Sequence, residues 1–139
     1  MKFLSAYIIM GVLWAEAQEV VLERRADGLW YNPGSQTSYT GKAERKYFDG
    51  ARISEVSYLK GRQHGLSRFW YNNGNIRSTF SYNAGVLDGN STYHYRNGNI
   101  QNLTPYRQGV KHGLVVDWWP AGKKSFVESY VNGFPEGVW

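Results

Sequence analysis

The sequence predicts an all-β protein: an elongated single-layer antiparallel sheet of four stacked 24-residue β-hairpin repeats. Glycines recur every 24 residues in three columns, which are Gly50, Gly74, Gly98 and Gly122; Gly61, Gly85, Gly109 and Gly133; and Gly41, Gly65, Gly89, Gly113 and Gly137. Two aromatic columns keep the same step, namely Tyr47, Tyr71, Tyr95 and Trp119, then Tyr58, Tyr82, Tyr106 and Tyr130. Five columns in register over four units indicate a repeat array.

The composition agrees with a folded β protein. The chain has 139 residues, of which 42% are hydrophobic and 19% charged, which is typical of one folded domain and not of a disordered tail. Aromatic residues make up 17% and glycines number 16, a pairing that favours short strands joined by tight turns. There is no cysteine, so neither a disulfide framework nor a lipid-modified cysteine is available to the chain.

Residues 1–17 are predicted to be a signal peptide. Lys2 gives a basic start, Phe3 to Trp14 is an apolar run, and Ala15-Glu16-Ala17 places small residues where a signal peptidase cuts. We expect cleavage near Ala17-Gln18 and a mature protein that is secreted, periplasmic or held at the cell surface. An uncleaved anchor is the alternative, although the apolar run is shorter than the ~20 residues that span a bilayer.

Residues 18–40 precede the repeats and are expected to form an N-terminal cap. Val20-Val21-Leu22 suits a short strand, and the segment Asp27 to Gly34 (DGLWYNPG) carries turn signals around an aromatic pair. The terminal unit of a repeat array covers an otherwise open end and is usually atypical. A cap of this kind is therefore the expected role.

The repeat array occupies residues 41–139, as units 41–64, 65–88, 89–112 and 113–136 followed by a partial unit 137–139. In each unit a run such as Leu66 to Tyr71 meets a turn such as Asn73-Gly74, and a second run such as Ile76 to Tyr82 meets a glycine-rich connection. Asn-Gly between two such runs indicates a tight hairpin turn, because both residues tolerate positive φ at its centre. The predicted structural turn glycines are Gly50, Gly61, Gly65, Gly74, Gly85, Gly89, Gly98, Gly109, Gly113, Gly122, Gly133 and Gly137. The tail from Phe134 to Trp139 is expected to fold back over the last strand; the alternative is that a second copy of the chain or the partner occupies this edge.

Strand periodicity predicts an aromatic ladder on one face of the sheet and a mixed, mostly polar surface on the other. In the second unit Ser67, Phe69 and Tyr71 share a side, opposite Leu66, Arg68 and Trp70. The candidate partner-binding residues are Phe69, Tyr71, Phe80, Tyr82, Tyr93, Tyr95, Tyr106, Trp119 and Tyr130. Two roles stay open for them, which are covering a face that has no second layer and lining a groove for an extended partner.

The repeat pattern G-x-x-x-x-x-Y-x-x-G-x-I, followed by F-x-Y-x-x-G-x-x-x-G, resembles the MORN-variant repeat. The lead-in from Asp27 to Lys42 (DGLWYNPGSQTSYTGK) resembles the entry to the first repeat in bacterial YwqK-family antitoxin-type proteins. The resemblance implies an elongated sheet that serves as a scaffold for protein or lipid contacts, with no catalytic residues to carry over. Thr104-Pro105 and Glu128 depart from the pattern at the position of Phe80, so the third and fourth units are expected to pack less well there.

No catalytic constellation, cofactor or metal site is predicted. His64, Asp88, His112 and Glu136 share one column, but equivalent residues of stacked hairpins lie two strands apart, roughly 10 Å at ~4.8 Å per strand. A shared metal needs every ligand atom within about 2.0–2.2 Å, so a polar turn residue is the better interpretation. No nucleophile motif and no phosphate-binding glycine loop is present.

The predicted function is an exported, non-catalytic repeat scaffold that binds another protein. One alternative is a surface-binding module for anionic lipid or cell-wall glycan, which the formal net charge of +5 and the aromatic ladder favour. Another alternative is an antitoxin-like partner of a toxin, implied by the family resemblance. No nucleic-acid partner is expected, because the basic residues are scattered and form no run.

Overall fold

The computed structural model of the protein describes residues 20–136. The predicted signal peptide, 1–17, and the partial unit 137–139, which includes the predicted turn glycine Gly137, lie outside the described residues. Over the described part the chain forms strands and turns without a helix, so no helix there is long and apolar enough to cross a membrane.

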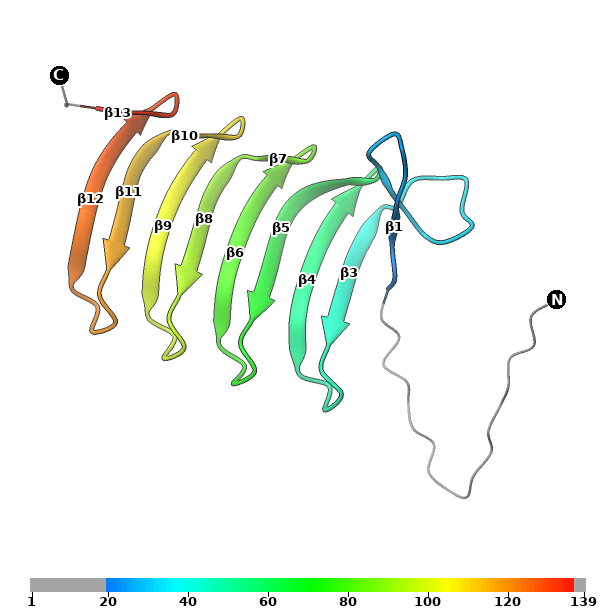
Figure 1. Ribbon diagram of the computed structural model, residues 1–139, viewed down its shortest axis with the longest axis horizontal. Coiled ribbons are helices and arrows are strands. Elements are labelled where there is room, and N and C mark those ends of the chain that lie inside the picture. The colour runs from blue at the N-terminus through cyan, green and yellow to red at the C-terminus, as the bar shows by residue number, and fades with distance from the viewer. Residues whose placement is uncertain (1–19, 137–139) are drawn as a thin grey trace.

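An 11-stranded antiparallel sheet dominates the fold, in the order β13-β12-β11-β9-β8-β6-β5-β4-β3, with β7 beside β6 and β10 beside β9. Figure 1 shows these strands side by side in one curved ribbon, with the N-terminal segment at one end. The predicted all-β array of hairpins is confirmed. The strands of the large sheet are β3 (Gly41–Lys46), β4 (Arg52–Leu59), β5 (Arg62–Trp70), β6 (Ile76–Asn83), β7 (Val86–Leu87), β8 (Gly89–His94), β9 (Ile100–Arg107), β10 (Val110–Lys111), β11 (Gly113–Trp118), β12 (Lys124–Val131) and β13 (Phe134–Pro135).

The Asn-Gly turns differ from the prediction in their backbone conformation. Gly74 has a φ of 84°, whereas Asn73 is not among the residues with positive φ. The amide of Gly74 donates to the carbonyl of Tyr71, and the amide of Tyr71 donates to the carbonyl of Asn75, at 3.0 and 2.9 Å. The register shifts between Phe69 and Trp70. The turn is therefore a three-residue hairpin loop with a glycine bulge, and positive φ is needed only at its glycine.

The glycine-rich connections are themselves hairpin turns, so each unit has a short second hairpin beside the long one that was predicted. Ala84 and Gly85 both have positive φ, 49° and 90°, and Asn83 pairs with Val86 across them. Two central residues with positive φ define the type I′ turn, whose twist matches that of the flanking strands. The same turn recurs at Lys60-Gly61, Gln108-Gly109 and Asn132-Gly133.

Hydrogen bonds between neighbouring repeats tie the ribbon along both edges. At the type I′ turns, the amide of Gly85 donates to the carbonyl of Gln63 at 2.7 Å, and the pairs Gly109 to Leu87 and Gly133 to Lys111 repeat this bond. At the opposite edge the side-chain amides of Asn73 and Asn75 both donate to the carbonyl of Arg96. Those of Asn97 and Asn99 donate in the same way to the carbonyl of Pro120.

The N-terminal segment packs against the first repeat. The amide of Trp30 donates to the carbonyl of Gly61 at 3.0 Å, and the amide of Gly61 donates to the carbonyl of Tyr39 at 2.7 Å. Within the segment β1 (Glu23–Arg24) pairs with β2 (Trp30–Tyr31). Tyr31 is buried, and its hydroxyl donates to Asp27 Oδ2 at 2.6 Å. These bonds give the segment a small packed centre of its own at one end of the sheet.

At the other end the tail turns back on the last long strand. After the turn at Asn132-Gly133, Phe134 and Pro135 form β13 opposite Val131 and Tyr130. The amide of Glu136 then donates to the carbonyl of Ser129 at 2.8 Å. The described part of the tail thus covers the C-terminal portion of β12, as expected, and leaves its portion from Lys124 to Glu128 uncovered by residues 20–136.

Candidate binding surface

One face of the sheet, which we call the ladder face, carries most of the predicted aromatic residues. Strand pairing places a row of residues side by side across it. In order across the sheet the row consists of Ser54, Phe69, Ser78, Tyr93, Asn102, Asp117 and Phe126. Rings alternate with serines as far as Tyr93, then the polar side chains of Asn102 and Asp117 follow, and Phe126 ends the row.

In the middle of the ladder face the aromatic rings pack on one another. The ring centre of Phe80 lies 5.9 Å from that of Phe69, 5.5 Å from that of Tyr93 and 6.4 Å from that of Tyr82. Such edge-to-face pairs stabilise beyond the area they bury. Burial raises the pKa of Tyr82. This part of the ladder covers the sheet with its own side chains, because no second layer lies over it (Figure 1).

The opposite face is mixed and mostly polar, as predicted. Glu55 is buried there, and its Oε1 pairs with Lys42 at 3.3 Å and with Arg68 at 3.0 Å. The hydroxyls of Thr79 and Thr92 share a hydrogen bond of 2.7 Å between strands β6 and β8. These side chains satisfy one another, so they serve packing of the sheet.

Tyr71 and Tyr95 do not continue the ladder beside Phe69 and Tyr93. The register shift near the end of each strand interrupts the alternation that predicted this, and both tyrosines follow the last residue of their strand. The hydroxyl of Tyr71 donates to the carbonyl of His94 at 2.8 Å, and that of Tyr95 donates to the carbonyl of Trp118 at 2.7 Å. Each therefore ties its hairpin to the next one.

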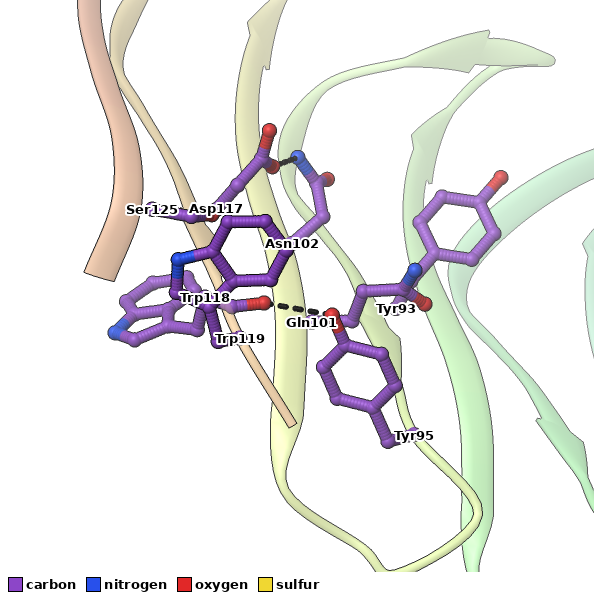
Figure 2. Close-up of a pocket in the computed structure, with 8 residues that line it drawn as sticks. All are labelled: Tyr93, Tyr95, Gln101, Asn102, Asp117, Trp118, Trp119 and Ser125. Carbon is purple, nitrogen blue, oxygen red and sulfur yellow. Dashed lines mark hydrogen bonds between the residues drawn. The ribbon is translucent and has the colours of Figure 1, made fainter. Parts of the chain in front are cut away.

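A groove of about 350 Å³ opens on the ladder face of the third and fourth units. Figure 2 shows the residues that line it, which are Tyr93, Tyr95, Gln101, Asn102, Asp117, Trp118, Trp119 and Ser125. Tyr93 is 45% exposed and Trp119 is 59% exposed. The volume lies within the range of small-ligand sites in proteins. The groove therefore combines open aromatic walls with amide, hydroxyl and carboxylate groups.

The groove arises where the repeats depart from their own pattern. Asp117 stands one repeat after Tyr93, Asn102 one repeat after Ser78, and Thr104 one repeat after Phe80. With the ring of the Phe80 position replaced by a small side chain, the aromatic packing stops. Thr104 Oγ1 instead donates to Asn102 Oδ1 at 2.9 Å, and Asn102 Nδ2 donates to Asp117 Oδ1. The sequence predicted weaker packing at Thr104, but the residues of the polar pair were not among the predicted site residues.

The two remaining ladder tyrosines lie toward the type I′ turns. Tyr106 pairs with Gly89 and with Lys111. The hydroxyl of Tyr130 donates to Glu128 at 2.5 Å, and this bond raises the pKa of Tyr130. Lys111 Nζ lies 4.8 Å from the ring centre of Tyr130. Glu128, the second departure at the Phe80 position, is thus partnered within its own strand.

The column histidines are structural. His64 Nδ1 accepts a hydrogen bond from the amide of Ala84 at 3.3 Å, and His112 Nδ1 accepts one from the amide of Asn132 at 3.4 Å. Both donors are the first residue of a type I′ turn. This arrangement matches the predicted role of polar turn residues. His94 differs, since its Nδ1 is buried without a hydrogen-bond partner and burial lowers its pKa.

The comparison with protein families identifies the class of repeat. The model of the MORN repeat variant matches residues 63–84 and 87–108, two consecutive stretches one repeat apart. Each stretch holds one hairpin, most of β5 with β6 in the first and β8 with β9 in the second. Residues 63–84 and 87–108 are therefore MORN-variant repeats, as the sequence pattern predicted. The comparison with curated proteins and that with solved structures found no match. The likeness of the lead-in to antitoxin-type proteins stays a prediction.

Proposed function

We propose that this protein is an exported, non-catalytic scaffold that binds another protein through its ladder face. The observation that carries the proposal is the exposure of large aromatic side chains on and beside this face, at 45% for Tyr93, 44% for Phe126 and 59% for Trp119. Contiguous exposed apolar groups mark interaction sites on soluble proteins. Tyrosine and tryptophan are also enriched at the centres of protein interfaces.

The shape of the array supports an extended partner. A repeat array presents a long surface in which each unit contacts only its neighbours. MORN repeats are in general interaction modules for proteins and membranes, and they are typically non-catalytic. The sequence adds no nucleophile motif and no catalytic constellation to this scaffold. Export rests on the predicted signal peptide, residues 1–17.

The test is capture of partners from the exported fraction, with variants that separate the two faces. Tyr93→Ala and Phe126→Ala alter the ladder face, whereas Leu66→Ala and Leu114→Ala alter exposed apolar residues of the opposite face. We expect the ladder-face pair to lower the affinity for the purified partner at least tenfold, about 1.4 kcal/mol, and the matched pair to leave it within twofold. Equal losses from both pairs would contradict the proposal.

A glycan or an anionic lipid surface is the second candidate ligand class. The groove favours a glycan, because exposed rings beside amide and carboxylate groups suit the faces and hydroxyls of a sugar. Sedimentation with cell-wall material and with anionic vesicles tests this candidate. Binding to an anionic surface should weaken steeply between 0.05 and 0.5 M salt, on the order of the fall in Debye length over that range, whereas an aromatic protein interface should persist. A toxin would be one case of a protein partner.

A further inference from the structure

In the second repeat, the chain places its own arginines over two aromatic rings of the ladder side. The guanidinium carbon of Arg77 lies 5.7 Å from the ring centre of Phe69, and that of Arg96 lies 5.3 Å from the ring centre of Tyr71. A cation within about 6 Å of a ring centre is attracted by the negative face of the ring. Each of these rings is thus covered by an internal cation.

One repeat further on, the rings are kept and both cations are lost. Tyr93 and Tyr95 stand 24 residues after Phe69 and Tyr71, but the equivalents of Arg77 and Arg96 are Gln101 and Pro120. Within residues 20–136, no arginine or lysine stacks on Tyr93 or Tyr95. Both tyrosines line the groove.

A carboxylate stands beside these rings. Asp117 pairs with Asn102 across the sheet, and Asn102 pairs with Tyr93. Asn102 holds Asp117 Oδ1, while Oδ2 has no hydrogen bond and the carboxylate has no ion pair among the described residues. Figure 2 shows Asp117 and Asn102 joined at one side of the groove, with Tyr95 bound to the backbone of Trp118. The site thus offers rings and one free anionic oxygen.

We propose that this groove binds a guanidinium group, the arginine side chain of a partner protein, and the inference rests on the proposed function. The guanidinium stacks on the rings of Tyr93 and Tyr95, as Arg77 and Arg96 stack on Phe69 and Tyr71 within the chain, with the exposed indole of Trp119 beside it, and donates to Asp117 Oδ2. Planar guanidinium suits both contacts better than a compact ammonium does. The chain has a formal net charge of +5, and Lys123 and Lys124 precede the groove residue Ser125. Long-range attraction therefore does not favour a cationic ligand, so its affinity must come from contacts inside the groove.

The first measurement uses small probes on the intact protein. N-acetyl-arginine amide is titrated against N-acetyl-citrulline amide, which has nearly the same shape and no charge, and chemical shifts of the Trp118 and Trp119 indoles are followed. We expect saturable binding of the arginine probe, with a Kd on the order of 1 mM, and at least tenfold weaker binding of citrulline. Equal binding of the two probes, or a response to N-acetylglucosamine alone, overturns the inference. Lysine amide binding as tightly as arginine overturns the preference for guanidinium.

Substitutions then test which groove residues bind the arginine probe without disturbing the fold. Asp117→Asn keeps an acceptor for Asn102 but removes the charge, and Gln101→Arg restores the internal cation that Arg77 supplies one repeat earlier. We expect each to weaken binding of the arginine probe about tenfold, Asp117→Asn because the charge-assisted hydrogen bond is lost and Gln101→Arg because the new cation covers the ring. The matched controls are Asp88→Asn, outside the groove, and Gln101→Met, which adds no charge; both should stay within twofold.

The outcomes also separate this inference from the proposed function. If ladder-face variants weaken the partner while Asp117→Asn and Gln101→Arg leave partner and probe unchanged, the guanidinium site is wrong and the scaffold stands. If the probe binds with the expected variant pattern but no partner depends on Tyr93 or Phe126, the guanidinium site stands and the protein interface is wrong. Far-UV circular dichroism of each variant confirms that the fold is kept.

Discussion

Two different reasons can require glycine at a turn, namely a backbone with positive φ and a lack of space for a side chain. Comparing Gly61→Ala with Gly74→Ala separates them. Gly61 and Gly74 have similar φ values, 75° and 84°. Alanine at either position costs about 1 kcal/mol for left-handed backbone, partly offset by ~0.4–1 kcal/mol from the restricted unfolded chain. At Gly74 no atom lies within 4 Å of the added Cβ. Gly74→Ala is therefore expected to cost about 1 kcal/mol or less.

At Gly61 the same change meets the N-terminal segment. The added Cβ would lie 2.8 Å from Leu29 Cβ and 3.2 Å from the backbone nitrogen of Trp30. Overpacking of this kind costs about 1–3 kcal/mol. We expect Gly61→Ala to destabilise the first repeat by about 2–4 kcal/mol in total and to undock residues 20–40, because the bonds of Gly61 to Trp30 and Tyr39 hold that segment.

Urea unfolding followed by tryptophan fluorescence measures the two free energies, and hydrogen exchange of the Trp30 amide locates the effect. With m-values of about 1–3 kcal/mol/M, the midpoint for Gly61→Ala should fall on the order of 1 M below that for Gly74→Ala. Exchange at Trp30 should accelerate only in Gly61→Ala. Equal midpoints with unchanged exchange at Trp30 would refute the docking of the N-terminal segment on this turn.

Three further predictions follow from the repeat geometry and from His94. Deleting 65–88 should leave a folded protein by circular dichroism, whereas deleting 65–76 should unfold it, because only the first keeps register; equal melts would contradict the array. Because the pKa of His94 is lowered, the unfolded chain binds its proton first, so stability should fall as pH drops below about 6.5, and His94→Gln should reduce that slope in pH-dependent melts. Removing 134–139 should uncover the edge of β12 and give concentration-dependent oligomers by light scattering; a truncated protein that stays monomeric with an unaltered melt would exclude this.

The 24-residue register made the fold predictable, while two adjacent residues with positive φ were expected at the Asn-Gly turns and are found at the glycine-rich connections. Glycine columns are visible because positive φ is a backbone requirement that few other residues meet. Ala84 meets the same requirement with φ of 49°, yet the residues of its column are chemically unrelated, so the sequence marked only the glycine of each type I′ turn and not the residue before it. Asn73-Gly74 carried the strongest turn signal, and the asparagine there donates to the next repeat instead of adopting positive φ.

The candidate site was predictable only in part. Tyr93 and Trp119 were identified as binding candidates because they continue aromatic columns. Asp117 and Asn102 belong to no repeating column of one residue type, so the 24-residue pattern did not mark them, whereas the groove depends on the positions that fail to repeat. Comparing each unit with the one before it, position by position, would have marked both residues. Their hydrogen bond and its placement beside Tyr93 required the strand register of the structure.

The asparagine bonds at the turns give the array a polarity. Asn73 and Asn75 donate forward to the third unit and Asn97 and Asn99 donate forward to the fourth, but the turn of the fourth unit, Ala121-Gly122-Lys123, has no side-chain amide to pass on. A duplicated copy of 65–88 inserted after itself would find an acceptor ahead and a donor behind. The same copy placed after 136 would meet no donor from the turn before it. A unit duplicated in the middle of the array therefore keeps the asparagine hydrogen bonds between consecutive turns, whereas a unit added after the fourth does not.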